Sequence, residues 1–324
     1  MFKNKYLQYI SLWVLCSAAA AQNWAPTKNV EIIVSSVPGG SNDKTGREIE
    51  KALNELKLVP TSTAIVSKPG GGGGIAMAYT NQHAGDGHYV MVVTSSINSN
   101  HIVGASKLTY NDFTPIASLV NDYVVFAVKV DGSLKTAKDL MVQLKSKPQA
   151  VVTGFANTFG SSRHIAAGLL IKAIGGNARD LKTVVFKGSS EAISALLGAH
   201  LEMVIIGAGN AVAHVQSGRM RVLAVTSPQR LTGALSSVPT WRELGVDVVS
   251  GSWRGVMGPR DMPAAQLAFW ENAMRMVSQN AGWKVDLERN YWSEDFAIGA
   301  QFRKDLEKDY VDTKKVLVDI GLAK

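Results

Sequence analysis

Residues 30–43 have the sequence VEIIVSSVPGGSND, and this stretch decides which fold class the chain is expected to adopt. Its first seven residues are rich in β-branched side chains, which predicts a buried strand that ends at the turn residues Val37-Pro38-Gly39-Gly40. Apolar residues then recur at positions 49, 52, 53 and 56, a spacing typical of a helix that packs on a sheet. A strand, a glycine loop and a helix in this order indicate an α/β fold with parallel strands.

The same alternation continues along the chain and predicts two sheets. In the first block, strands are expected at 63–66 and 89–94, separated by five glycines at 70–74 and a short helix. In the second block, strands are expected at 124–130, 151–155, 183–186, 203–206 and 222–226, with helices at 137–145, 162–174, 189–197 and 211–217. Residues 263–277 and 296–320 are expected to be helical, and they are assigned to the first block because they contain too few strands for a separate domain.

The first 22 residues have the pattern of a secretory signal peptide, in which a lysine-containing start precedes an apolar stretch and small residues. Leu15 precedes Cys16, where a lipid-attachment site needs a small residue, so we expect cleavage near Ala21 without lipid. A permanent anchor is the alternative, but polar residues interrupt the roughly 20 apolar residues that a membrane span requires. The single cysteine would leave with this peptide, so no disulfide or cysteine ligand is expected in the mature chain.

Composition and missing motifs narrow the possible function classes. Loss of Lys3 and Lys5 with the leader lowers the net charge from +8 to +6, and the basic residues are scattered, so no nucleic-acid partner is expected. The run from Pro38 to Thr45 lacks the glycines of a phosphate-binding loop, and Asp43 would repel phosphates. The sequence has no Gly-x-Ser-x-Gly motif, and its six histidines include no metal-binding pair. We therefore expect no enzyme, no metal site and no cofactor.

Five loops of small residues each lie between an expected strand and an expected helix. Ligands of open α/β sheets bind beyond the carboxyl ends of the strands, where free NH groups at helix N-termini favour carboxylates. Each loop alone is more typical of a turn with a helix cap. Five of them without accompanying catalytic residues favour a binding cleft. The loops are residues 35–43, 70–74, 94–96, 158–162 and 187–189.

Eight segments stand in the order and spacing of a known family. They are PGGxxD at 38–43, KPGGGG at 68–73, DGHY at 86–89, DFTPI at 112–116, KGS at 187–189, SGRMRVLAVT at 217–226, VPT at 238–240 and ELG at 243–245. From about Asn29 to the end, the chain resembles the periplasmic solute-binding receptors of tripartite tricarboxylate transporters, also called Bug-type receptors. Within this family, Trp253-Arg254-Gly255 is more similar to the tricarboxylate receptors than to the amino-acid receptors.

The resemblance implies a two-lobed periplasmic-binding-protein architecture. Each lobe is expected to be a mainly parallel sheet flanked by helices, with crossing strands between the lobes and the ligand cleft between them. Residues 1–22 would be the signal peptide, residues 23–124 and 252–324 lobe 1, and residues 125–251 lobe 2. Backbone NH groups and hydroxyls of the cleft loops would hold a ligand carboxylate, partly through water.

The resemblance also implies which residues bind the ligand. Many relatives have Asp where the strand at 203–206 ends, whereas this chain has Gly207, which disfavours an amino-acid ligand and leaves more room. Arg254 can bind a second carboxylate through two hydrogen bonds, although an arginine beside Trp253 is as often a packing residue. Trp253 can stack on a planar ligand. The expected ligand-binding residues are Ser36, Pro38, Gly39, Ser41, Asn42, Asp43, Thr94, Ser95, Ser96, Thr158, Phe159, Gly160, Ser161, Ser162, Gly207 and Arg254.

The implied function is that of an exported, non-enzymatic receptor. It would be a periplasmic monomer that binds a small di- or tricarboxylate, either citrate-like or an aromatic dicarboxylate. Its other partner would be the membrane subunits of a tripartite tricarboxylate-type transporter, to which it delivers the ligand. The alternative is an exported α/β enzyme that acts on a carboxylate ester or amide, with Asp43 or His164 as the base.

Overall fold

The computed structural model describes residues 24–156 and 158–323, so the expected signal peptide lies outside the described residues. The strands are β1 (Val30–Val34), β2 (Thr63–Ser67), β3 (Tyr89–Thr94), β4 (Phe113–Lys129), β5 (Thr153–Ala156), β6 (Thr183–Phe186), β7 (Met203–Gly207), β8 (Met220–Val225), β9 (Gly251–Pro259) and β10 (Ser293–Ile298). The α-helices are α1 (Ser41–Glu55), α2 (Gly74–Asn81), α3 (Ser96–Ile102), α4 (Ala137–Ser146), α5 (Ser162–Ala173), α6 (Ser189–Leu197), α7 (Ala208–Gln216), α8 (Ala264–Gln279), α9 (Ala281–Asn290) and α10 (Gly299–Asp319).

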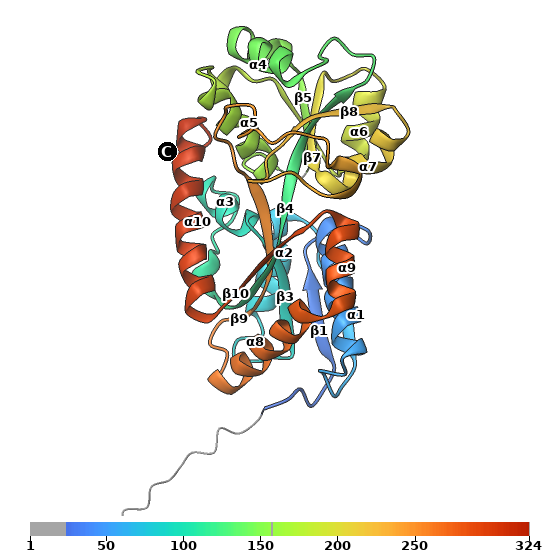
Figure 1. Ribbon diagram of the computed structural model, residues 1–324. Helices are drawn as coiled ribbons and strands as arrows, with labels where there is room; N and C mark the ends of the chain where they lie inside the picture. Colours follow the sequence, from blue (N-terminus) through green and yellow to red (C-terminus); the bar gives the residue numbers. More distant parts are fainter. Residues whose placement is uncertain (1–23, 157, 324) are drawn as a thin grey trace, which may run out of the picture.

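The 17-residue strand β4 joins all the strands into one sheet (Figure 1). Its first part, residues 113–123, pairs antiparallel with β9, and β10 pairs with the same part from the other side. Its second part pairs antiparallel with β7 and β8. The order β2-β1-β3-β9-β4-β7-β5-β6 is therefore continuous. The sequence predicts a strand only from Val124 onward, because Pro115, Asn121 and Asp122 interrupt the apolar pattern before it.

Three parallel strands lie on each side of β4. The groups are β2-β1-β3 and β6-β5-β7, as expected from strands that alternate with helices. The α/β fold class is confirmed, but β4, β8, β9 and β10 are antiparallel additions, so each part of the sheet is mixed.

Helices cover both faces of the sheet, and β1 shows why. Ile32 and Val34 belong to a core cluster with residues of α1 and α8, whereas Ile33 faces a second cluster with residues of α2 and α10. Residues along β4 alternate in the same way, since Phe126 packs with α5 residues and Val125 with residues of α6 and α7. A strand buried on both faces needs apolar side chains at successive positions. The run VEIIV meets this requirement.

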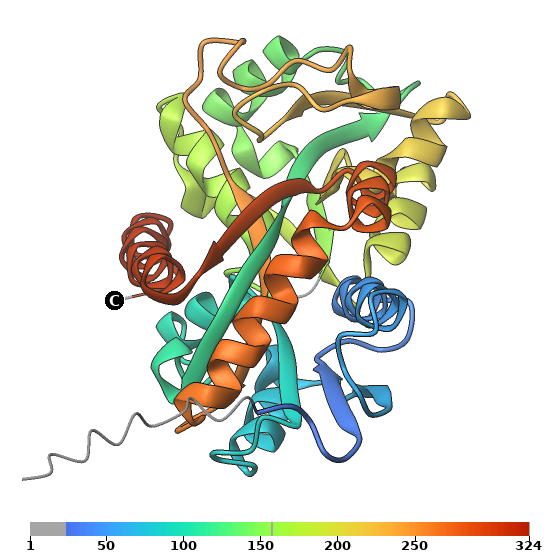
Figure 2. The ribbon, with the colours of Figure 1, turned by 60° about the horizontal axis from the view of Figure 1, so that its bottom comes forward.

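The C-terminal elements return to the first part of the sheet. Figure 2 shows α8 lying along β4, and the two elements are in contact. The helix α10 contacts both α3 and α5. One prediction is wrong here, because Phe296 lies in β10 and the last helix begins only at Gly299. Within the part of the chain that the structure describes, no helix is long and apolar enough to cross a membrane.

The close crossing of β4 and β9 depends on Gly255. A Cβ at this position would lie 2.2 Å from the backbone oxygen of Ala117, so Gly255→Ala must displace backbone. We expect the variant to lose about 1–3 kcal/mol of unfolding free energy in urea. Gly74→Ala is the matched control, because Gly74 has a helical φ of −59° and no atom within 4 Å of the added Cβ. Equal stability of the two variants would contradict the tight crossing.

Candidate functional site

The buried carboxylate of Asp43 organises the loop between β1 and α1. Its Oδ2 accepts hydrogen bonds from Gly39 N at 2.8 Å and from Arg47 Nε at 2.9 Å. Its backbone NH donates to Ser36 Oγ at 2.9 Å. Burial by itself raises the pKa of Asp43, but the hydrogen bonds from Arg47 and Gly39 outweigh burial and hold the pKa below its ordinary value. Asp43 is therefore an ionised group that holds its loop, and its contacts do not suit a catalytic base.

The tip of the same loop is exposed at Pro38, Gly39 and Ser41. The helix α1 begins at Ser41, and its N-cap residue Gly40 has no side chain. Among the described side chains, Ser36 caps the first turn through the hydrogen bond from Asp43 N, and no described side chain accepts from the NH groups of Ser41 and Asn42. NH groups without a partner at a helix start are free to bind an anion. Asn42 instead turns toward the protein, since its Nδ2 donates to Ser35 Oγ at 2.7 Å.

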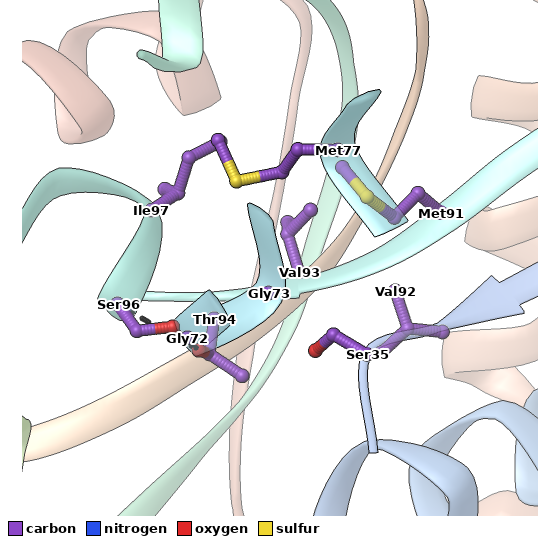
Figure 3. A pocket seen from close by; sticks show the side chains of 10 residues that line it. All are labelled: Ser35, Gly72, Gly73, Met77, Met91, Val92, Val93, Thr94, Ser96 and Ile97. Carbon is purple, nitrogen blue, oxygen red and sulfur yellow. Dashed lines mark hydrogen bonds between the residues drawn. The ribbon is translucent and has the colours of Figure 1, made fainter. Parts of the chain in front are cut away.

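The hydroxyls of Thr94 and Ser96 lie 2.7 Å apart at the carboxyl end of β3 and line a small pocket (Figure 3). The Oγ atoms of Ser95 and Ser252 are 3.3 Å apart, which connects this loop to β9. The pocket volume of ≈ 20 Å³ is enough for one water molecule but not for a dicarboxylate. The pocket is lined by Ser35, Gly72, Gly73, Met77, Met91, Val92, Val93, Thr94, Ser96 and Ile97.

The glycine run forms a wall of this pocket. Residues 70–73 all have positive φ, a conformation that glycine adopts without strain. The carbonyl oxygen of Gly72 accepts a hydrogen bond from Asn100 Nδ2 at 2.5 Å, and a Cβ at Gly72 would lie 2.7 Å from that nitrogen. Gly72 is therefore needed for the close packing of this run against α3.

His164 organises the loop between β5 and α5. Its Nδ1 accepts a hydrogen bond from Gly160 N at 3.2 Å, and its ring stacks on Phe155 with the centroids 5.1 Å apart. Burial lowers the pKa of His164 to about 4, so the ring is neutral at pH 7. Phe159 packs edge-on against the same ring and is otherwise exposed. His164 therefore positions the loop, and its hydrogen-bonded Nδ1 is not a free base.

Ser161 and Ser162 stand at the start of α5 as expected from the sequence. Ser161 is only 3% exposed, and its Oγ has no hydrogen-bond partner among the described residues. No described side chain caps this helix. Gly160 lies against Val103 at the end of α3, which brings the loop toward the elements around Thr94.

Arg254 is buried in an ion pair with Asp122 of β4, and the two residues are 2% and 4% exposed. Its Nη2 donates to Asp122 Oδ2, and its Nη1 donates to Thr45 Oγ1 at 3.3 Å. The guanidinium lies 4.8 Å from the ring centroid of Trp292. Arg254 thus has partners inside the protein, and a ligand carboxylate bound to it stays a prediction. Trp253 packs edge-on against Phe302.

Gly207 ends β7 beside the same carboxylate. A Cβ at Gly207 would lie 2.9 Å from Asp122 Oδ2. The acidic group at this point comes from β4 and fills the space that a side chain at 207 would need. The expectation that Gly207 leaves more room is therefore wrong.

Arg163, the second residue of α5, belongs to the same buried group, although sequence reasoning did not select it. It is 4% exposed, and the charges of Asp122 and Arg254 both act on it. Its Nε has no hydrogen-bond partner among the described residues, and none of their carboxylates forms an ion pair with it. A cation in the first turn of a helix opposes the helix dipole. An arginine at the second position of the predicted helix was therefore the signal that the sequence offered. For Asp122 the signal was a charge within an apolar strand.

These contacts bring three elements that follow or contain the predicted loops toward one centre. The helix α1 reaches it through Thr45, and β3 reaches it because Thr94 pairs with Arg254 in the sheet. The start of α5 reaches it through Arg163. The residues that the structure describes include no cluster of three or more metal-ligating side chains. The arrangement can bind an anion, but it does not present an activated nucleophile.

Comparisons with known proteins show a family and several solved structures to which the chain is similar. Residues 48–322 match the family described as the tripartite tricarboxylate transporter family receptor. Protein BugT of Bordetella pertussis is 27% identical over 270 residues, which is 80% of each chain. An R. palustris protein solved with adipate is 24% identical with a TM-score of 0.82, over 92% of this chain and 99% of that one. MatC from Rhodopseudomonas palustris, solved with bound malate, is 21% identical with a TM-score of 0.74, over 90% of this chain and 99% of that one.

The neutral His164 makes stability depend on pH. Its pKa of about 4 in the folded protein lies below the ordinary 6.5, so the unfolded chain binds the proton first as the pH falls. The contribution of the neutral His164 ring to the unfolding free energy is fully present above about pH 6.5. It declines between pH 6.5 and 4, by up to about 3 kcal/mol. We expect the unfolding free energy measured in urea to fall between pH 7 and pH 4.5. This fall should be smaller for His164→Gln than for the parent protein.

His200→Gln is the control for this comparison, because His200 is exposed and lies outside the loop. We expect it to show the same pH dependence as the parent. A parental pH dependence in His164→Gln would show that the His164 ring is not the titrating group.

Proposed function

Because the chain belongs to the receptor family of tripartite tricarboxylate transporters, we propose that it binds a small di- or tricarboxylate and delivers it to the membrane subunits of such a transporter. The family is one of binding proteins, so the chain is a receptor and not an enzyme. The observation that best supports a carboxylate ligand is the buried basic group of Arg254 and Arg163, which Thr45 of α1 contacts and which lies at the start of α5, a helix without a side-chain cap. The relatives solved with adipate and malate support the dicarboxylate class.

We further propose that residues 23–124 and 252–324 act as one lobe and residues 125–251 as the other. Two of the four apolar clusters consist mainly of residues from the first set, and the other two mainly of residues from the second. The proposed boundaries fall within β4 and at the start of β9, so these strands would be the hinge. Since the pocket beside Thr94 has room for no more than one water molecule, the ligand would enter when the lobes open about these strands.

The loops described above would then line the cleft, with the predicted set from Ser36 to Arg254 as the ligand-binding residues. Export to the periplasm after removal of the leader fits this role, and a solved structure with the same fold is the periplasmic binding protein BugD. A monomer is sufficient, because both halves of the proposed cleft come from one chain.

The receptor proposal predicts binding without turnover. We expect adipate, malate or citrate to raise the melting temperature of the purified protein, and hexanoate, which has one carboxylate, to raise it less. Mass spectrometry of gently purified protein should identify any retained acid. The enzyme alternative predicts hydrolysis of a carboxylate ester such as p-nitrophenyl acetate. Ester turnover, or no response to any of the three acids, would refute the proposal.

The start of α5 should contribute to affinity. Replacing both Ser161 and Ser162 by Ala removes up to two hydrogen bonds to a charged ligand, so affinity for the binding acid should fall at least about tenfold in calorimetry. The matched control replaces Ser236 and Ser237, a pair of adjacent exposed serines outside the five candidate loops. Unchanged affinity in the first variant would remove this loop from the site.

A further inference from the structure

The charges buried where β4 and β9 meet do not balance. Asp122 contributes one negative charge, while Arg254 and Arg163 contribute two positive charges. Burial lowers the pKa of both arginines, but the ordinary pKa of a guanidinium is so high that the group keeps its proton in proteins. The group therefore carries one excess positive charge.

The hydrogen bonds assign this excess to Arg163. Arg254 has Asp122, Thr45 and the ring of Trp292 as partners. Asp122 is thus committed to Arg254, and Arg163 has no carboxylate partner among the described residues. A buried charge without a partner is strongly unfavourable unless something else compensates it.

A second unpartnered group stands two residues before Arg163 in the sequence. The Oγ of Ser161 is buried without a hydrogen bond to any described residue, and it stands just before the uncapped start of α5. A hydroxyl, free NH groups and a guanidinium offer several donors to one oxyanion, and the helix dipole adds to their attraction.

We propose that Arg163, together with the Ser161 hydroxyl, binds one carboxylate of the ligand and thereby selects dicarboxylates over monocarboxylates. This inference rests on the proposed receptor function. Arg254 then has a different task, because it neutralises Asp122 and holds α1 to the crossing strands. A carboxylate on Arg163 makes the buried group neutral, so the bound state is the electrostatically balanced one.

Arg163→Met tests this assignment, since methionine fills much of the same space without charge. We expect adipate affinity to fall at least about thirtyfold, because one partner of a buried charge pair is lost. Hexanoate affinity should change much less. Without ligand, the melting temperature of the variant should equal or exceed that of the parent, because an uncompensated charge has been removed. Arg303→Met, on the exposed side of α10, is the control and should leave both measurements unchanged.

The outcomes separate the two proposals. If the parent binds none of adipate, malate and citrate, the receptor proposal fails and the role of Arg163 fails with it. If the parent binds adipate and Arg163→Met binds it equally well, or melts earlier without ligand, only the role of Arg163 is overturned. Should Arg163→Met not fold, Arg163→Lys keeps the charge but loses the planar fork. It should then weaken adipate binding more than hexanoate binding, and equal loss for both acids would overturn the inference.

Discussion

The ion pair between Asp122 and Arg254 is the interaction on which the centre of the molecule depends. It joins β4 to β9, the two strands that would link the lobes, and Thr45 extends the same hydrogen-bonded group to α1. Both charged groups are withdrawn from water, so removing either one would leave an uncompensated charge in the interior. Asp122 also excludes any side chain at position 207, because the end of β7 lies directly against its carboxylate. The Asp122–Arg254 pair therefore constrains β4, β9, α1 and β7.

The remaining polar side chains divide into those that hold loops and those that have no partner. Asp43 shapes the loop before α1 through its Oδ2 and its backbone NH, and His164 holds the loop before α5 through its Nδ1. These two residues were the candidate bases of an enzyme, and their contacts explain their presence without catalysis. By contrast, the Ser161 hydroxyl and the Arg163 guanidinium are buried with hydrogen-bonding capacity unused within the described residues. Buried polar groups without hydrogen bonds destabilise the folded protein, and a ligand that supplies acceptors would offset this destabilisation.

The family pattern and this chain differ in where the central acidic group comes from. The resemblance leads one to expect Asp at the end of β7, but the structure has Gly207 there and a carboxylate from the neighbouring strand. The Asp122 carboxylate lies close to where the expected Asp side chain would stand, but its partner is Arg254. In the proposed receptor, this arrangement would remove an acceptor for a ligand amine and leave a basic group in excess, which suits an acid with more than one carboxylate.

The sequence by itself determined the local elements and the family. The bounds of β3, β6 and α6 agree with those expected, because hydrophobic periodicity, glycine turns and helix starts are properties of neighbouring residues. Tertiary structure decided that the strands form one sheet and which partner each buried charge has. Asp122 and Arg254 are 132 positions apart, and Arg254 and Thr45 are 209 positions apart. No local pattern encodes such pairs, because they exist only after the chain has brought the crossing strands together.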